Sequence, residues 1–246
     1  DGLFRNDKEA AEYASRIDLS TVASGYYTAT GAYGKGVRGG DIKYLDLNGD
    51  NIVNGGKGTL DDPGDRRVIG NSSPRYQYGA SLNFSWYGFD VSVFMQGIGR
   101  LDWYPGADNL RFWGPYCRPY ATFVPKNFMS QVWSEENPDA YFPRARAYTS
   151  LNSNSGTAYY TNDRYLQNLA YCRLKNLTIG YTIPRRLTSK VGIKECRIYF
   201  SGENLATWSA LKSDFLDPEQ AAADSDKKAN VYPWCKTYSI GLNLTF

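Results

Sequence analysis

The sequence contains no histidine, which removes the commonest general base in enzymes and the usual nucleophilic triads. Paired acids such as Asp61 with Asp62 and Glu135 with Glu136 fall in segments rich in turn residues, where solvated charge is the ordinary explanation. Glu203 is an isolated acid within a strand-like run, but a glycosidase needs two facing carboxyl groups. The sequence therefore predicts a protein that is not an enzyme.

Long apolar runs are also missing, and no stretch of about 18 consecutive apolar residues could form a membrane-spanning helix. A membrane β-strand stays open, since it needs only about ten residues with every second one apolar. The 4 cysteines show no C-x-x-C spacing and have no histidine to complete a zinc set. They are either unpaired packing residues or disulfide partners in an unassigned pairing. A net charge of +3 gives no reason to expect nucleic-acid binding.

Aromatic residues are abundant instead, at 15% of the chain, which suits interfacial girdles in a membrane or a ligand-contacting surface. Apolar residues also recur at every second position in five runs, with small or polar residues between them, and this period predicts β-strands. The first two runs should form a hairpin with a tight turn at Tyr87 and Gly88. The five runs are 76–86, 89–96, 165–181, 196–208 and 238–246.

A soluble sandwich would also alternate, but three features favour strands in lipid. The apolar sets begin or end in aromatic residues, the opposite face is built of Asn, Ser, Thr, Gly, Gln and Asp, and the connections alternate between short and long. Short turns on one side and long loops on the other are the plan of an outer-membrane barrel. Since the smallest such barrels have about eight strands, we expect an all-β chain that forms the C-terminal strands of a longer transmembrane antiparallel β-barrel.

Strand parity predicts the organisation of this barrel portion, residues 1–246. In chain order we expect an extracellular loop region (1–75), a hairpin (76–97), a long extracellular loop (98–164), a second hairpin (165–208), an extracellular loop (209–235) and a closing strand (236–246). The turns near Gly88 and at 184–192 are then periplasmic. Only 8–17 and 128–133 are short helix candidates, both in loops.

Short sequence motifs follow one another in a fixed order along nearly the whole chain. They are GDIKY (40–44), DLNGD (46–50), DR (65–66), VIGNSSP (68–74), GFD (88–90), FMQG (94–97), YFPR (141–144), LKNL (174–177), GYTIP (180–184), SGENL (201–205) and TYSIGLNLTF (237–246). In this order they resemble the SusC/RagA-type TonB-dependent transporters of Bacteroidetes. Because the resemblance spans many motifs in register, it is more specific than any one of them.

The resemblance implies an outer-membrane barrel of about 22 strands with a plugged lumen. It also implies TonB-dependent active import of large nutrients with a SusD-like surface lipoprotein, where TonB acts through an N-terminal part outside these residues. Oligosaccharides are favoured over peptides as the expected cargo. The alternative that the sequence leaves open is a calcium-dependent extracellular binding or adhesion module built as a soluble β-structure.

One loop has the spacing of oxygen ligands found in the first half of an EF-hand-like Ca²⁺ site. The second half departs from that pattern, because Asn51 replaces the turn glycine and Lys57 replaces the closing carboxylate. With an insertion at 54–64, closure would fall to Asp62 or Asp65. The alternative is a loop in which these residues supply turn chemistry only. The candidate Ca²⁺ ligands are Asp46, Asn48, Asp50, Ile52 and Asp65.

The segment 102–120 is rich in aromatic residues beside Asp and Arg, a combination that holds sugar rings but also packs loops together. Packing is the favoured role for most of them, and Trp103, Tyr104 and Trp113 are the candidate ligand contacts. Three arginines could reach a lumen, although solvated loop charge is their default interpretation: Arg144, Arg146 and Arg164.

The last strand resembles the signal by which the barrel-assembly machinery recognises its substrates. Gly241, Leu244 and Phe246 carry this resemblance. Physically, such a strand must complete closure by pairing with the first strand, which removes the last open edge from the lipid. The alternative is that Phe246 is simply an aromatic residue of the interfacial girdle.

Overall fold

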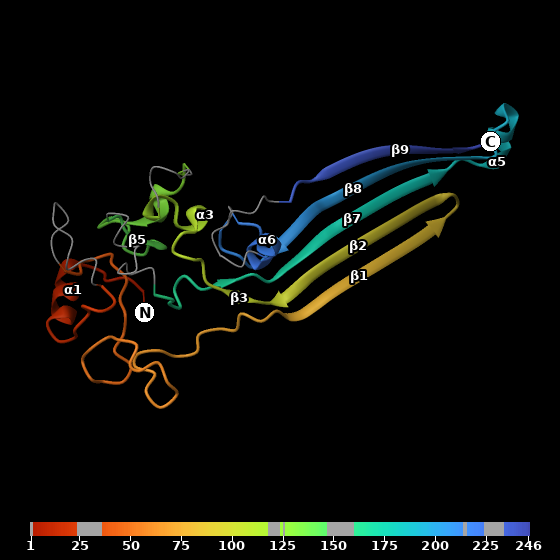
Figure 1. Ribbon diagram of the computed structural model, residues 1–246. Coiled ribbons are helices and arrows are strands. Elements are labelled where there is room, and N and C mark those ends of the chain that lie inside the picture. The colour runs from red at the N-terminus through yellow and green to blue at the C-terminus, as the bar shows by residue number, and fades with distance from the viewer. Residues whose placement is uncertain are drawn as a thin grey trace. The chain divides into compact units, whose positions relative to one another are not determined.

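The computed structural model describes residues 2–23, 36–117, 124, 126–146, 160–213, 216–223 and 234–246. The chain divides into two compact units, which we call the sheet unit and the loop unit (Figure 1). The sheet unit consists of Asn71–Trp103, Asn168–Ala223 and Val231–Phe246. The loop unit consists of Asp1–Gly70, Tyr104–Gln167 and Asp224–Asn230.

The sheet unit is built on a 5-stranded sheet in the order β1-β2-β7-β8-β9. Its strands are β1 (Arg75–Trp86), β2 (Phe89–Arg100), β7 (Tyr171–Thr182), β8 (Glu195–Ser209) and β9 (Thr237–Thr245). Every neighbouring pair is antiparallel. The expected all-β fold with about five antiparallel strands is therefore confirmed (Figure 1).

One strand starts later than its alternation suggests. The run expected over 165–181 forms a long strand only from Tyr171. Just before it, the Asn168 side chain accepts a hydrogen bond of 2.9 Å from the backbone N–H of Ala170. In this local turn the Ala170 N–H bonds to a side chain, whereas in a longer strand it would be available to bond to the backbone of a neighbouring strand.

The hairpin of β1 and β2 closes through Tyr87 and Gly88, whose φ angles are 46° and 88°. Two consecutive positive φ angles are typical of the tight turns that match the twist of antiparallel strands. A side chain at Gly88 would place its Cβ 2.8 Å from the carbonyl oxygen of Thr182, so only glycine fits there. The Thr182 N–H donates to the Gly88 carbonyl at 2.8 Å, which ties this turn to the end of β7.

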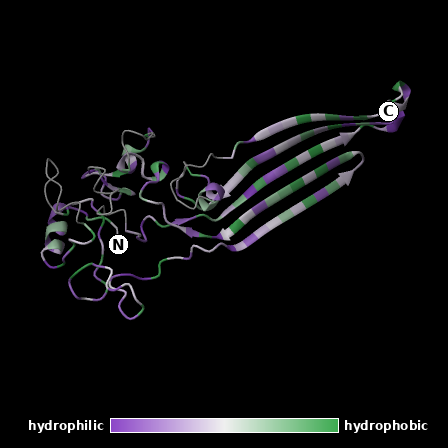
Figure 2. Ribbon diagram, in the orientation of Figure 1, coloured by the Kyte–Doolittle hydropathy of each residue, from purple (hydrophilic) through white to green (hydrophobic). Residues whose placement is uncertain are grey.

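Cross-strand register brings residues of one kind into rows that cross all five strands. Each row takes one residue from every strand, in sheet order. The apolar row is Phe84, Val91, Ile179, Phe200 and Ile240. The neighbouring row, on the opposite face, is Asn83, Ser92, Thr178, Ser201 and Ser239. Hydropathy accordingly alternates along each strand (Figure 2).

Register shifts keep the apolar face continuous towards the end of the sheet where β7 begins. Between β2 and β7 the pairing shifts from Phe94 with Asn176 to Met95 with Leu174, so that Lys175 is the extra residue of a bulge on β7. Leu174 then pairs with Met95 on one side and Ala206 on the other. Without the bulge, Leu174 would face the polar side of the sheet, because a shift of one residue exchanges the two faces.

The remaining elements are short. They are α1 (Asp7–Ala14), β3 (Asp102–Trp103), α3 (Leu110–Trp113), η1 (Gly114–Tyr116), η2 (Met129–Gln131), β4 (Val132–Trp133), β5 (Phe142–Arg144), β6 (Gln167–Asn168), α5 (Arg185–Thr188), η4 (Ser189–Val191) and α6 (Pro218–Ala223). The candidates at 8–17 and 128–133 thus correspond to α1 and to the single 3-10 turn η2. The other short helices were not expected from the sequence. Among the described residues, no helix is long and apolar enough to cross a membrane.

The loop unit has a core of its own around α1. Asn6 caps this helix by accepting the Glu9 N–H at 2.9 Å. Seven buried residues pack together there: Phe4, Ala10, Leu19, Val22, Ala23, Val37 and Val53. Arg146 forms a bidentate ion pair with Asp41 beside them in the same unit, at 2.5 and 2.8 Å, and both side chains are almost fully buried. The loop unit is therefore a folded body and not a set of unsupported loops.

Candidate functional site: the polar face of the sheet

The polar face of the sheet carries an ion pair between strands that are not neighbours. The Arg197 guanidinium of β8 reaches Asp90 of β2 at 2.9 Å (Nε to Oδ1) and 2.5 Å (Nη2 to Oδ2). β7 lies between these two strands, and its residue at this level is Gly180. A Cβ at Gly180 would lie 2.5 Å from both partners, so the missing side chain is what lets the pair form.

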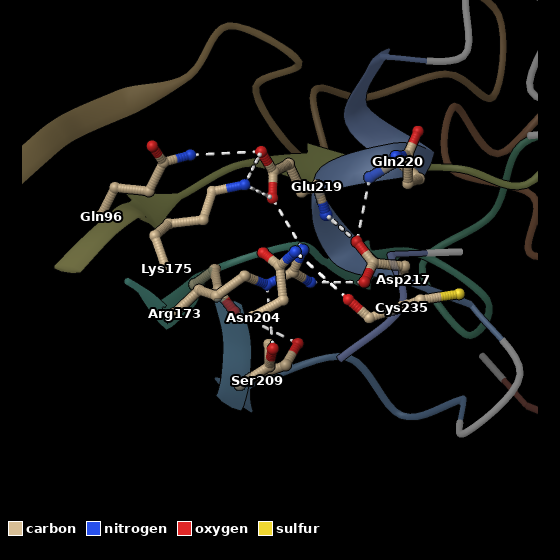
Figure 3. Close-up of polar contacts among 11 residues, drawn as sticks. Gln96, Arg173, Lys175, Asn204, Ser209, Asp217, Glu219, Gln220 and Cys235 are labelled. Carbon is tan, nitrogen blue, oxygen red and sulfur yellow. Dashed lines mark hydrogen bonds and ion pairs between the residues drawn. The ribbon is translucent and has the colours of Figure 1, made fainter. Parts of the chain in front are cut away.

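A larger charge cluster lies at the opposite end of the polar face (Figure 3). Its centre is Arg173 of β7, whose side chain is 1% exposed. Arg173 forms ion pairs with Asp217 through Nη2 and with Glu219 at 2.8 Å through Nη1. Its Nε donates to the Thr207 hydroxyl of β8 at 2.9 Å. These contacts occupy each of the three guanidinium nitrogens and compensate for their burial.

Further polar groups surround the Glu219 carboxylate (Figure 3). The Lys175 ammonium lies 2.9 Å from Oε1, and the Gln96 amide of β2 donates to the same oxygen at 3.2 Å. Lys175 also lies 4.6 Å from the ring centroid of Trp234, a distance at which a cation is attracted to an aromatic face. Two cations and two carboxylates therefore neutralise one another at this end of the sheet.

The acidic half of the cluster comes from α6 and the residue before it. Asp217 caps α6, since its Oδ1 accepts the N–H groups of Glu219 at 3.0 Å and Gln220 at 3.1 Å. Leu216, Pro218 and Ala221 are buried as the segment packs down. The connection between β8 and β9 thus places one short helix on the polar face. This cluster was not predicted from the sequence, in which the available signal was Arg173, a charged residue at a polar-face position of a strand.

The five candidate Ca²⁺ ligands lie in one loop of the loop unit, and Asp65 closes it. The Asp65 carboxylate accepts the N–H of Leu47 at 2.6 Å and of Asn54 at 2.8 Å. The Asp46 carboxylate accepts the N–H of Gly49 at 2.6 Å and of Asn51 at 2.9 Å. The carboxylates therefore order the loop through backbone hydrogen bonds.

The middle of the same loop is also held by its own side chains. Asn48 accepts the N–H of Asp50 at 3.0 Å, and Asp50 accepts the N–H of Ile52 at 2.8 Å. Within the described ranges, no group of three His, Cys, Asp or Glu side chains is arranged to hold a metal ion. The Ca²⁺ site at Asp46, Asn48, Asp50, Ile52 and Asp65 consequently stays a prediction.

The three aromatic residues singled out as ligand contacts are buried. Trp103, Tyr104 and Trp113 are 6%, 8% and 1% exposed. Trp113 stacks edge-on against Phe112 and Tyr165, and its indole N–H donates to the Gly106 carbonyl at 3.0 Å. Burial raises the pKa of Tyr104 well above its ordinary value. Packing accounts for their positions, and their contact with a ligand stays a prediction.

The three arginines considered for a lumen all make contacts within the loop unit. Arg144 lies 4.7 Å from the Trp133 ring, and Arg146 pairs with Asp41. Arg164 donates to the Ala140 carbonyl at 2.6 Å. These contacts give each of them a structural role inside that unit.

The closing strand shows why glycine occupies one of the three positions that were predicted to form an assembly signal. A Cβ at Gly241 would lie 2.2 Å from the Tyr199 ring of β8, so the ring lies across the glycine. Leu244 pairs with Cys196 on the apolar face and is 42% exposed, and Phe246 is 72% exposed. Their recognition by an assembly machinery stays a prediction.

Comparison with known proteins supports the resemblance found in the sequence. No family model matches the chain. The chain is 28% identical to TonB-dependent receptor P26 of Formosa agariphila over 84% of its residues, and 27% identical to TonB-dependent receptor P3 of the same organism over 85%. It spans 20% and 19% of the lengths of these curated relatives.

A solved structure shares the fold. The structure described as that of the RagAB peptide transporter superposes on 74% of this chain and 18% of its own, with a TM-score of 0.51 and 24% identity. The predicted resemblance is thus confirmed by two kinds of comparison: the chain is similar in sequence to two TonB-dependent receptors and similar in fold to the RagAB peptide transporter.

Proposed function

We propose that the sheet is part of the wall of an outer-membrane β-barrel that imports large nutrients with energy supplied through TonB. The observation that carries this proposal is the register of the five strands. Apolar side chains form continuous rows on one face and small polar side chains form rows on the other. A wall between lipid and a wet lumen requires this division.

The exposure of the apolar face supports the same assignment. Leu82, Phe84 and Ile240 are 66%, 57% and 84% exposed within the described chain, as expected of side chains that meet lipid. Aromatic residues mark one end of the face, where Trp86 pairs with Phe89 and Phe89 pairs with Tyr181. The alternative adhesion module would need another protein layer over this face.

Strand parity assigns the two sides of the wall. The connections at 87–88 and 183–194 face the periplasm, while the loops expected at 1–75, 98–164 and 209–235 face the outside of the cell. A SusD-like surface lipoprotein is the partner proposed for that outer side. TonB is proposed to act through a part of the protein beyond this chain.

The charge of the polar face bears on the class of cargo. The polar face near Arg173 has neutralised charge, which suits an uncharged polar cargo, and oligosaccharides are the class we propose. The solved relative named above is described as a peptide transporter, so peptides are the competing class. Uptake of labelled oligosaccharides and labelled peptides by cells with and without the full-length gene separates the two.

Spin labels in the full-length protein test the wall itself. Labels at Leu82, Val93 and Ile240 should collide with oxygen dissolved in lipid, while labels at Asn83, Ser92 and Ser239 should collide with a water-soluble nickel chelate. The four native cysteines must first be replaced, and each label position has its control on an adjacent residue of the same strand. Equal access of the nickel chelate to both sets would refute the membrane wall.

A further inference from the structure

The connection between β7 and β8 forms an ordered basic turn at one end of the sheet. Its residues 183–194 contain four cations and no acid: Arg185, Arg186, Lys190 and Lys194. All four are exposed, and among the described residues none of them has an ion-pair partner. The whole chain has a net charge of only +3, so this turn concentrates positive charge that the rest of the sequence balances.

The turn is held in a defined shape by its backbone. α5 and η4 fill most of it, and Gly192 ends the helical part with a φ of 76°. The Ile183 N–H donates to the Cys196 carbonyl and the Lys194 N–H to the Thr245 carbonyl, each at 2.8 Å. The cations are therefore carried on a rigid support attached to β8 and β9.

Two apolar side chains accompany the cations. Leu187 and Val191 are 59% and 71% exposed on the same turn. Each of them directly follows an exposed cation, Arg186 and Lys190. An ordered turn that presents exposed apolar side chains next to cations has the chemistry of a segment that lies in a membrane interface.

The position of the turn in the sheet fits such an interface. β7 ends at Thr182, just before the turn, and the ring centroid of the preceding Tyr181 lies 4.5 Å from that of Phe89. Phe89 pairs in turn with Trp86, so aromatic residues of the apolar face cluster at this end. Aromatic girdles mark the depth of lipid headgroups, and residues just beyond them meet the phosphates.

We propose that the turn 183–194 binds the anionic headgroups of phospholipids in the leaflet at this end of the sheet. The inference rests on the proposed membrane wall and adds a lipid partner to it. Arg185, Arg186, Lys190 and Lys194 pair with lipid phosphates, and Leu187 and Val191 enter the acyl boundary. Glu195, the first residue of β8, is the nearest acid in sequence and leaves the turn strongly positive.

Native mass spectrometry of the full-length protein, released from mixed bilayers, tests the proposal. Bilayers contain phosphatidylethanolamine with phosphatidylglycerol as the anionic probe. The wild type should retain phosphatidylglycerol in preference to phosphatidylethanolamine. Replacing all four cations by Gln should lower that preference about tenfold or more, since each cation near an anionic surface contributes up to about fivefold.

The matched control removes the same charge from the loop unit. Lys8, Arg16, Lys57 and Lys126 are exposed there, and their joint replacement by Gln should leave the lipid preference unchanged. The variant with Arg185→Lys and Arg186→Lys keeps the charge and should keep the preference. If the fourfold variant fails to assemble, each single Gln variant should lose part of the preference.

Three results overturn the inference. The first is a wild type that shows no preference for phosphatidylglycerol. The second is a turn variant whose lipid preference equals that of the loop-unit control. The third is a turn variant that loses binding to peptidoglycan sacculi while its lipid preference stays intact. A full-length protein that is soluble without detergent refutes the membrane wall instead. The two failures are therefore distinguishable.

Discussion

Arg197 and Asp90 meet across the backbone of Gly180, although a whole strand separates them in the sheet. Their contact joins β2 and β8 directly, on the polar face. Since β7 supplies no side chain at this level, the pair acts as a clamp across three strands. Because the pair requires that Gly180 has no Cβ, substitution of this glycine by alanine tests it.

Gly180→Ala should displace the clamp, because the new Cβ would lie 2.5 Å from Asp90 Oδ1 and from Arg197 Nη2. We expect a loss of about 1 to 3 kcal/mol in the free energy of unfolding, seen as a lower midpoint in heat-modifiability gels. Gly79→Ala on β1 is the matched control, since its Cβ would meet nothing closer than 3.6 Å. An equal loss in both variants would show that the strain lies in the strand backbone and not in the clamp.

The Arg173 cluster predicts how firmly α6 is held. Arg173→Met removes the main partner of Asp217 and Glu219, so amide hydrogen exchange in 216–223 should become at least about tenfold faster. Arg67→Met is the control, because its pair with Asp163 is exposed and should contribute little. Unchanged exchange in Arg173→Met would mean that apolar packing alone holds α6.

The strands were predictable from sequence because their information is local. Alternation of side chains identifies β1 and β2 directly, and a turn with Gly88 fits the short gap between them. The late start of β7 was not predictable in the same way. There the side chain of Asn168 competes for a backbone donor, and alternation does not record that competition.

The charge cluster was missed for a different reason. Asp217 and Arg173 are 44 residues apart, and each looks like an ordinary charged residue in its own segment. α6 has only 6 residues and would be a marginal helix alone, so its presence depends on the cap and on docking. Asp62 and Asp65 could be named from the sequence as acids able to close the Asp46 loop, because Lys57 stands where the closing carboxylate is expected.

The buried pair of Asp41 and Arg146 gives a pH-dependent prediction for the loop unit. Burial raises the pKa of Asp41 above 3.8, and Arg146 partly opposes this shift. Arg146→Met should therefore raise the pKa further and cost about 3 to 5 kcal/mol at neutral pH. A folded-state pKa above the unfolded one means that stability is full at pH values below the unfolded pKa and falls as pH rises through the folded pKa.

Pulsed hydrogen exchange of residues 4–19 in urea measures this effect in the full-length protein. The difference between Arg146→Met and wild type should be smaller at pH 5 than at pH 8. The double variant with Asp41→Leu should regain most of the loss and show no such pH dependence. A difference that grows towards acid pH would contradict the assignment to Asp41.

Calcium titration of the full-length protein tests the Asp46 loop. If the five candidate ligands bind Ca²⁺, calorimetry should detect binding, and Asp50→Asn should weaken it about tenfold or more. Asp61→Asn removes a neighbouring exposed carboxylate outside the ligand set and should leave the affinity unchanged. The absence of any heat of binding, with identical hydrogen exchange of 46–65 in EDTA and in Ca²⁺, would leave the loop with turn chemistry only.

Two variants of the closing strand distinguish a role in assembly from a role in stability. Phe246 is 72% exposed, so its deletion removes little packing, whereas Gly241→Ala forces a Cβ to within 2.2 Å of the Tyr199 ring. If Phe246 is part of the signal read by the barrel-assembly machinery, its deletion should sharply lower the amount of assembled protein and leave the unfolding midpoint of the assembled fraction nearly unchanged. Gly241→Ala should lower that midpoint, with a cost of about 1 to 3 kcal/mol, because the ring must move. Membrane fractions and heat-modifiability gels give both quantities from one culture. Normal assembly of the deletion variant with a lowered midpoint would instead make Phe246 an ordinary girdle residue, whose loss costs about 1 to 3 kcal/mol.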